Sequence, residues 1–290
     1  MIPNNSLSVL PWYTSRNQQD ARKWWAYGHV YPLFTPAGFL LPWQLIVPHI
    51  NNGSVNSITA AVLFDGNTDG QVGTYLSAIR DNTTYKAFAQ LGYDVFVFPG
   101  LLPIFNAMFD GRYYLRLTIG GQDYYSEIFT VVNYIADYLK IEWWDVEDFV
   151  MDAGTIVYNN PSFKNILYLC TDIGKPEYIF EEEGETRDGY FFPIKQISEK
   201  RYRFSFLASE YLLDVMRFIR MADFAEIEYH GQRYSLDTFL ITPDWEDNGD
   251  IASVQAEFDT ATVAKKVGLG YIKAQRGDFN DDFNNDYNNQ

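Results

Sequence analysis

The sequence predicts a mainly β protein: an N-terminal immunoglobulin-like β-sandwich, then an α+β module with one packed helix, with an extended arm at each end of the chain. Two observations support this fold class. Aromatic residues make up 18% of the 290 residues, and such residues fit the pleated surface of strands. Short apolar runs bounded by Gly, Asn, Asp and Pro recur along the chain, which is typical of strands joined by turns.

Changes of pattern divide the chain into parts. We expect an N-terminal aromatic arm at 1–35, a β-sandwich domain at 36–135, an α+β domain at 136–268 and an acidic, Asn-rich tail at 269–290. The arm is interrupted by Pro, shows no clear period and contains Trp24 and Trp25. Buried Trp and Tyr side chains supply much of the free energy of interfaces. We therefore expect Trp24 and Trp25 to bind a partner.

Residues 36–135 show the period of strands. The apolar runs are FLLPWQLIV, SITAAVLF, YDVFVF, RYYLRLTI and YYSEIFTVV. In the fourth run Leu115 and Leu117 alternate with Arg116, so one face of the strand should be buried. The four residues after this run, Gly120-Gly121-Gln122-Asp123, have the composition of a hairpin connection. Such closely spaced antiparallel strands predict the sandwich, and TYKAFAQL in the connection 73–90 predicts a short helix.

Residues 136–268 combine strand patterns with one helix pattern. The strand candidates are YLKIEWW, FKNILYLCT, EYIFEEE, YFFPIKQI, RYRFSF, AEIEYH, RYSLDTFLI and IASVQAEF. The segment SEYLLDVMRFIRMA places Leu212, Met216 and Ile219 at helical spacing, and Ser209 is suited to cap its first turn. We therefore expect a mostly antiparallel sheet with one packed helix.

The C-terminal tail ends in DFNDDFNNDYNNQ. A run of Asp and Asn without Lys or Arg cannot bury enough apolar surface to order itself. Within it, Phe279, Phe283 and Tyr287 recur every four residues, as anchors of a docking peptide would. We expect these three rings to bind another chain, whereas a purely solubilising tail is the alternative.

Composition limits the partners. The formal net charge of −16 argues against nucleic acid, because phosphate contacts need a basic surface. No apolar run approaches the roughly 18 residues that span a bilayer, so we expect no membrane span. The single cysteine, Cys170, lies in the apolar run ILYLC and is interpreted as a small core residue. The first residues lack the basic and apolar regions of a signal peptide.

Candidate catalytic residues are few. The three histidines, His29, His49 and His230, have unrelated neighbours, and we find no spacing typical of a hydrolase triad, a zinc site or a nucleotide-binding loop. Acidic residues beside aromatic ones, as in Trp144-Asp145, suggest the glycosidase pair of carboxylates, but the run EEEGE is typical of a solvated segment. We expect no enzyme activity and no cofactor. Sugar binding without catalysis stays open as an alternative.

One loop has half of a calcium pattern. Asp65, Asn67 and Asp69 occupy the first, third and fifth positions of such a loop, and Gly70 the sixth. The twelfth position is Leu76 instead of a bidentate Glu, so this is no EF-hand. A weak calcium site and a plain Asp/Asn/Gly connection are both consistent with the residues, and the plain connection is the main interpretation.

Four longer stretches carry a resemblance: YYSEIFTVV, YLKIEWWD, PEYIFEEEGETRDGYFFP and DWEDNGDIASVQAEFDTATVAKK. Together they resemble uncharacterised proteins encoded by phages and prophages of gut Bacteroidetes, including the crAss-like group. The resemblance covers roughly residues 110–267 and leaves the arm and the tail outside. It implies a structural role in the virion, in the tail or baseplate, and assigns no functional residues.

These observations give one expected function and one alternative. We expect a phage tail structural protein, made in the host cytoplasm, that assembles in several copies as a ring or collar through its terminal arms. Its partners would be copies of itself and neighbouring tail proteins. The alternative is a carbohydrate-binding or receptor-binding module of the tail, in which an exposed Trp12, Trp24 or Trp25 stacks on a sugar.

Overall fold

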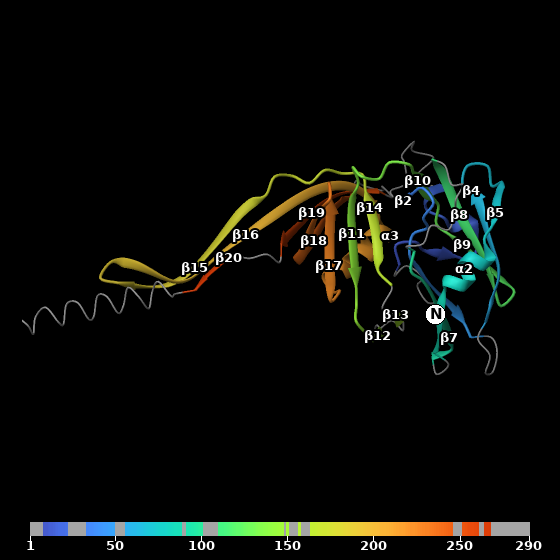
Figure 1. The fold of residues 1–290 in the computed structure, drawn as a ribbon, viewed down its shortest axis with the longest axis horizontal. Coiled ribbons are helices and arrows are strands. Elements are labelled where there is room, and N and C mark those ends of the chain that lie inside the picture. The colour runs from blue at the N-terminus through green and yellow to red at the C-terminus, as the bar shows by residue number, and fades with distance from the viewer. Residues whose placement is uncertain are drawn as a thin grey trace, which may run out of the picture.

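Strands dominate the computed structural model and make up 60% of it, so the protein is mainly β as predicted. The structure describes residues 8–22, 33–49, 56–88, 91–100, 110–147, 149–150, 156–157, 163–245, 251–260 and 264–267. The N-terminal strands form one end of the molecule, a second sheet with a helix lies beside them, and a ribbon of two long strands extends from the other end (Figure 1).

The first sheet is built around β8 (Gly111–Ile119). Among the described residues its other strands are β1 (Trp12–Tyr13), β2 (Phe34–Pro36), β4 (Ile58–Asp65), β5 (Gln71–Thr74), β9 (Gln122–Ser126) and β10 (Phe129–Val132). One edge of β8 pairs with β4, and the other edge pairs first with β9 and then with β10. The predicted hairpin between β8 and β9 is confirmed, with Gly120 and Gly121 at φ 59° and 82°, the left-handed region that a tight hairpin turn needs.

The N-terminal arm belongs to this sheet. β1 pairs with β9 and β2 pairs in parallel with β10, so the expected boundary at residue 35 does not separate an arm from a domain. Trp12 is only 3% exposed and packs edge-on against Trp43. The expectation of an exposed Trp12 is wrong, because burying its ring in this core removes a large apolar area from water. Trp24 and Trp25 lie outside the described residues.

A smaller sheet packs on the first. It consists of β3 (Trp43–Pro48), β7 (Tyr93–Phe98) and β6 (Thr84–Phe88) in that spatial order. Trp43 and Phe98 on one of its faces join the main core, whereas Val95 and Val97 on the other face pack with Phe163. The sheet is thus covered on both sides.

The helix in this part lies earlier than expected. It is α2 (Leu76–Asn82), whose Ile79 is fully buried. The predicted helix TYKAFAQL is wrong, since Thr84–Phe88 forms β6 and pairs with β7. Its Thr, Tyr and Phe favour the strand, and pairing with β7 overrides the helical spacing.

The second module contains an eight-stranded sheet in the described part of the chain. Its strands are β11 (Leu139–Trp144), β14 (Asn165–Leu169), β15 (Glu177–Arg187), β16 (Tyr190–Ser209), β17 (Phe224–Tyr229), β18 (Gln232–Trp245), β19 (Ile251–Thr260) and β20 (Ala264–Val267). Every pairing within it is antiparallel. Two short strands, β12 (Phe149–Val150) and β13 (Ile156–Val157), form a separate pair.

The predicted helix with its cap is confirmed. α3 (Glu210–Met216) continues as a 3-10 turn, η3 (Arg217–Arg220), and the Ser209 hydroxyl accepts a hydrogen bond from the Leu212 N–H. Leu212, Met216 and Ile219 are all buried. From within this helix, the Tyr211 hydroxyl hydrogen-bonds the backbone carbonyls of Ser8 and Val9 at 2.5 and 2.6 Å. The two modules therefore share one core.

Two further features bear on the sequence predictions. Cys170 is exposed, so its interpretation as a core residue is wrong; it directly follows β14, whose buried Leu169 ends the packed strand. No helix in the described residues is long and apolar enough to cross a membrane.

Candidate functional site

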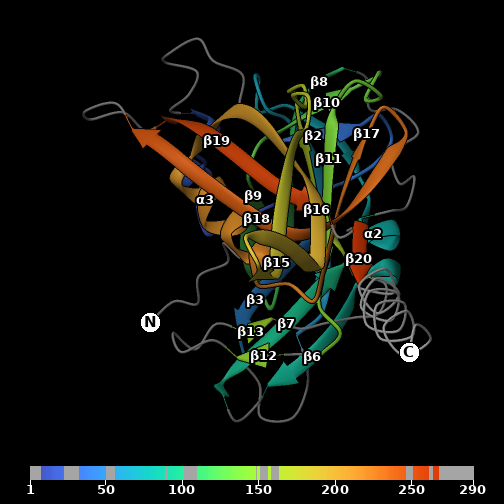
Figure 2. The ribbon, with the colours of Figure 1, turned by 90° about the vertical axis from the view of Figure 1, so that its left-hand side faces the viewer.

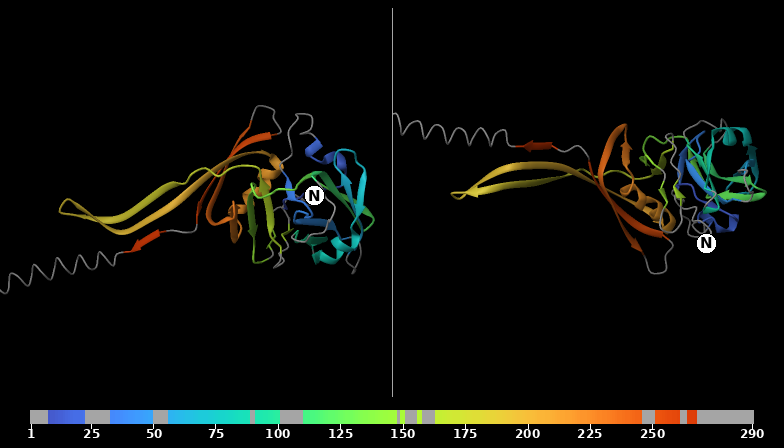
Figure 3. Two further views of the ribbon diagram at one scale, coloured as in Figure 1. Left: turned by 45° about the horizontal axis from the view of Figure 1, so that its top comes forward. Right: turned by 90° about the horizontal axis from the view of Figure 1, so that it is seen from below.

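The most distinctive surface of the molecule is a ribbon made of β15 and β16. β16 is 20 residues long, but β19 pairs only with its C-terminal part, from Arg201 to Ser209. The remainder continues with β15 away from the body. Figures 1 and 3 show this hairpin projecting from the second sheet, and Figure 2 views it end-on. The predicted strands YFFPIKQI and RYRFSF are thus parts of one strand.

A tight turn closes the far end of the ribbon. Asp188 and Gly189 both have positive φ angles, 51° and 83°, and Arg187 pairs with Tyr190 across the turn. Asp-Gly is a preferred dipeptide for such a two-residue turn, because both positions need the left-handed region. The sequence contains this signal between two strand patterns, although our sequence analysis did not use it.

Large apolar side chains are exposed to solvent along the ribbon. The exposed fractions are 60% for Tyr178, 69% for Phe180, 72% for Tyr190, 49% for Phe191 and 36% for Ile194. Tyr178 and Phe180 lie on one face of β15, as alternate residues of a strand do. Across from them are polar residues of β16, Lys200 opposite Tyr178 and Ser198 opposite Phe180. The Lys200 ammonium lies over the Tyr178 ring, 5.7 Å from its centroid, and neither ring has an apolar side chain directly opposite it.

The ribbon is also strongly acidic at its outer edge. β15 carries five glutamates in 11 residues, namely Glu177, Glu181, Glu182, Glu183 and Glu185. In the described part of the chain β15 pairs with β16 alone, so its other edge is open. Like charges placed opposite each other destabilise strand pairs, and this edge therefore resists pairing with the same edge of a second copy.

Ion pairs fix the base of the ribbon to the body. The Arg201 guanidinium donates two hydrogen bonds, of 2.8 and 2.9 Å, to the two carboxylate oxygens of Asp259 on β19. These bonds hold the pKa of Asp259 below its ordinary value even though burial raises it. Arg203 contacts Glu177 on β15 at 2.7 Å and Glu257 on β19 at 3.0 Å. Both arginines thus join β16 to its neighbouring strands where the ribbon meets the sheet.

Charge is divided unevenly between the two halves of the chain. Residues 1–132 contain eight acidic and seven basic residues, whereas residues 133–267 contain 26 acidic and 13 basic residues. The first module is thus nearly neutral, and the second module with its ribbon carries most of the negative charge.

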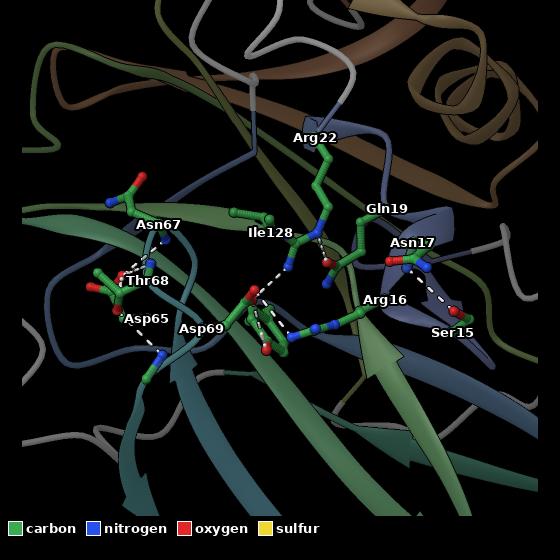
Figure 4. A network of polar contacts seen from close by, with 12 residues as sticks. Ser15, Arg16, Asn17, Gln19, Arg22, Asp65, Asn67, Thr68, Asp69 and Ile128 are labelled. Atoms are coloured by element: carbon green, nitrogen blue, oxygen red, sulfur yellow. Dashed lines mark hydrogen bonds and ion pairs between the residues drawn. The ribbon is translucent and has the colours of Figure 1, made fainter.

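The loop Asp65–Gly70 uses its acidic residues within the chain. The Asp65 carboxylate accepts hydrogen bonds from the backbone N–H groups of Asn67 and Thr68 and from the Thr68 hydroxyl. Asp69 points away from Asp65 and forms ion pairs with Arg16 and Arg22, at 3.1 and 2.7 Å (Figure 4). The structure does not bring the Asp65 and Asp69 carboxylates together. Their contacts are those of a plain connection that holds the N-terminal segment in place.

A buried carboxylate holds the same segment from the other side. Glu127 lies in the break between β9 and β10 and is fully buried. It accepts hydrogen bonds from the Tyr13 hydroxyl and from the backbone N–H groups of Asp20, Ala21 and Ile128. Burial raises the pKa of Glu127 to about 7 despite these donors. Three of its four donors, Tyr13, Asp20 and Ala21, belong to the N-terminal segment, so this carboxylate attaches the arm to the first sheet.

Three of the sequence-predicted anchors, Phe279, Phe283 and Tyr287, lie outside the described residues, as do Trp24 and Trp25. Among the described residues no group of three or more His, Cys, Asp or Glu side chains is arranged to hold a metal ion. The ribbon was not among the surfaces predicted from the sequence. Its signals are the Asp-Gly turn and the strand run EYIFEEE, in which glutamates share one face with Ile179 and the other face with Tyr178 and Phe180, so that neither face is continuously apolar.

Comparison with known protein families and with curated proteins gave no match for this chain. No protein-family model matches the chain, and no curated protein is significantly similar to it. The function is therefore inferred from the geometry and chemistry of the surface.

Proposed function

We propose that this protein is a structural component of a phage virion, in the tail or baseplate, that assembles in several copies by docking its β15–β16 ribbon onto a neighbouring copy. The projecting ribbon with its uncovered aromatic side chains is the observation that carries this proposal. An assembly role needs a surface that binds a partner. The projecting shape of the ribbon and its exposed aromatic side chains suit such a surface.

The energetics of the ribbon favour a bound state. β20 pairs with β16 from Lys195 to Ser198, and beyond it β15 and β16 form a two-stranded hairpin, which is marginally stable by itself in water. Large apolar side chains gathered on a monomer usually mark an interaction site. Covering Tyr178, Phe180 and Tyr190 would remove most of their apolar area from water, and aromatic residues are frequent anchors of interfaces. A neighbouring protein surface thus supplies the cover that the opposite strand lacks.

The charge distribution indicates which part of a neighbour the ribbon meets. A ribbon with five glutamates on one strand is repelled by the acidic second module of another copy, whereas the nearly neutral first module repels it least. The ribbon and the first module also lie at opposite ends of the molecule (Figure 3). A contact between them is head-to-tail, and such contacts close into a ring when the rotation between copies permits.

The phage setting comes from the resemblance described above and is part of the proposal. The expected docking of residues 278–290 is also part of it, as a second contact beside the ribbon. We propose as well that the first module is an immunoglobulin-like sandwich, supported by its two packed sheets and its β8–β9 hairpin. The location in the virion follows from the same setting.

A matched pair of variants tests the assembly role. We expect Tyr178→Ser, Phe180→Ser and Tyr190→Ser together to prevent association in sedimentation velocity, while thermal unfolding of the monomer changes little because all three rings are exposed. The control replaces three exposed side chains elsewhere, Val146, Met221 and Leu240, by Ser. Equal association of the ribbon variant and the wild-type protein would refute the proposal.

A further inference from the structure

A cleft of about 530 Å3 lies beside the strand β11, away from the ribbon. Its lining includes Tyr134, Asp137, Lys140, Tyr168, Glu228 and His230, which come from the connection before β11, from β11 and β14, and from β17 and the turn after it. Small-molecule sites commonly have volumes of about 300–1,000 Å3. The cleft therefore has the size of a site for a small ligand.

Three cross-strand neighbours form the floor of the cleft. Lys140 on β11 pairs with Tyr168 on β14 and with Glu228 on β17, so the three side chains share one face of the sheet. The Lys140 ammonium lies 4.0 Å from a Glu228 carboxylate oxygen and 2.5 Å from one of Glu142. The sheet thus holds an ammonium, a phenol and a carboxylate side by side.

The lining also contains an aromatic ring and a contact between an imidazole and a carboxylate. Tyr134 is 67% exposed, and the His230 Nδ1 atom lies 3.9 Å from an Asp137 carboxylate oxygen. His230 and Gly231, at φ 48° and 75°, form the two-residue turn between β17 and β18, across which Tyr229 pairs with Gln232. Such hairpin turns need a positive φ at both positions. The turn thus places His230 in the lining of the cleft.

The charges of the lining select the class of ligand. An anion would meet the carboxylates of Asp137 and Glu228. The Lys140 ammonium already contacts Glu142 and Glu228, at 2.5 and 4.0 Å, so a cation would have to compete with it for these carboxylates. A purely apolar ligand would take these charges out of water without replacing their hydrogen bonds, which is costly. A neutral ligand rich in hydroxyl groups has neither disadvantage, because a hydroxyl both donates and accepts.

The phenol in the floor stays a hydrogen-bond donor. Burial, together with the nearby charges of Glu142 and Glu228, raises the pKa of Tyr168 to about 12. The hydroxyl therefore keeps its proton at neutral pH. The lining then offers both hydrogen-bond donors and hydrogen-bond acceptors. The exposed ring of Tyr134 is available to pack against the apolar face of a sugar ring.

We propose that this cleft binds a neutral saccharide, with Lys140, Glu228 and Asp137 hydrogen-bonding its hydroxyl groups and Tyr134 packing against its ring. The site is separate from the ribbon, so saccharide binding does not depend on assembly. The two activities can therefore be tested independently in one protein.

Saturation-transfer NMR and calorimetric titration of the full chain test this proposal. The probes are the methyl glycosides of glucose, galactose, mannose and N-acetylglucosamine, with glucuronate and ethanolamine as charged comparisons. We expect at least one neutral glycoside to bind better than both charged compounds. Tyr134→Ala and Glu228→Gln should each weaken that binding by at least about tenfold, or about 1.4 kcal/mol. Tyr178→Ala, on the ribbon, should leave it unchanged.

Three outcomes would overturn the proposal. They are the absence of binding by all four neutral glycosides, preferred binding of glucuronate or ethanolamine, and binding that persists in both cleft variants. Tyr134 is mostly exposed, so its replacement should leave the fold intact, and thermal unfolding of each variant checks this. Loss of saccharide binding with intact association, or the reverse, separates this site from the assembly role.

Discussion

Adjacent tryptophans on β11 have opposite environments. Trp143 is 1% exposed and belongs to the core, as expected for one of two neighbours on a strand. The Trp144 ring instead stacks on Phe224, with 5.4 Å between ring centroids, and the Lys164 ammonium lies 3.7 Å from its centroid. One position thus fills the interior, while the next forms a half-buried aromatic and cationic cluster on the face of the sheet.

The two positions should differ in their contribution to stability. We expect Trp143→Ala to lower the free energy of unfolding by about 3–5 kcal/mol, because it leaves a cavity in a packed core. Trp144→Ala should cost less than about 2 kcal/mol, since it removes a stacked pair and a cation–π contact. Urea unfolding of the monomer measures both values. Equal losses at the two positions would contradict the assignment of faces.

Glu127 should make the stability depend on pH. Its pKa is about 7 in the folded protein against an ordinary value of 4.5, so the folded state holds the proton more tightly than the unfolded chain does. The contribution of Glu127 to the free energy of unfolding is therefore largest below pH 4.5. It falls by about 3 kcal/mol as the pH rises to 7.

Glu127→Gln removes this titration. We expect the wild-type protein to lose stability relative to the variant between about pH 5 and about pH 8 in urea unfolding. The amide also loses acceptor bonds, but that cost does not change with pH. Replacing the exposed Glu147 by Gln serves as the control and should give no such difference. A constant difference between Glu127→Gln and wild type across this range would contradict the buried, titrating carboxylate.

At the scale of an element, the helix α3 depends on its cap. Ser209 has extended backbone angles, φ −81° and ψ 162°, and its hydroxyl accepts from the Leu212 N–H at 3.5 Å. Ser209→Ala should lower the free energy of unfolding by about 1 kcal/mol. Ser205→Ala, at an exposed strand position, should change it much less. Equal effects of the two substitutions in urea unfolding would show that the cap does not stabilise the helix.

Local patterns predicted the elements whose causes are local. The Gly120-Gly121 turn and the Ser209 cap each follow from a few neighbouring residues, and both are confirmed. The attachment of Trp12 and Phe34 to the first sheet was not predictable in this way. It depends on pairing with Ser126 and Thr130, about a hundred residues away in sequence, and periodicity carries no information on such partners.

The length of β16 was missed for a related reason. Polar residues at Ser198, Glu199 and Lys200 separate YFFPIKQI from RYRFSF and resemble a connection when periodicity alone is considered. In the structure these residues continue the strand, because β15 pairs with them residue by residue. The candidate surface depends on this continuous pairing, because it forms where β15 and β16 leave the body together.

At the scale of the whole molecule, the ribbon and the first module have complementary properties. The ribbon combines exposed aromatic residues with a strongly acidic strand, and the first module is nearly neutral and also exposes large side chains, among them Val72, Tyr85 and Leu91. They lie at opposite ends of the chain's long axis (Figure 1). A ribbon bound to its own first module would have to fold back over the second sheet, so the contact is between copies.

Photo-crosslinking from the tip of the ribbon tests this contact most directly. Replacing Tyr190, which is 72% exposed, by a photoreactive benzoylphenylalanine places the probe beside the turn. We expect irradiation of the assembled protein to join two copies, with the crosslinked peptides of the second copy lying in residues 8–132. Crosslinks confined to one copy or to the second module of the neighbour, or a chain that stays monomeric at every concentration, would contradict the head-to-tail assembly.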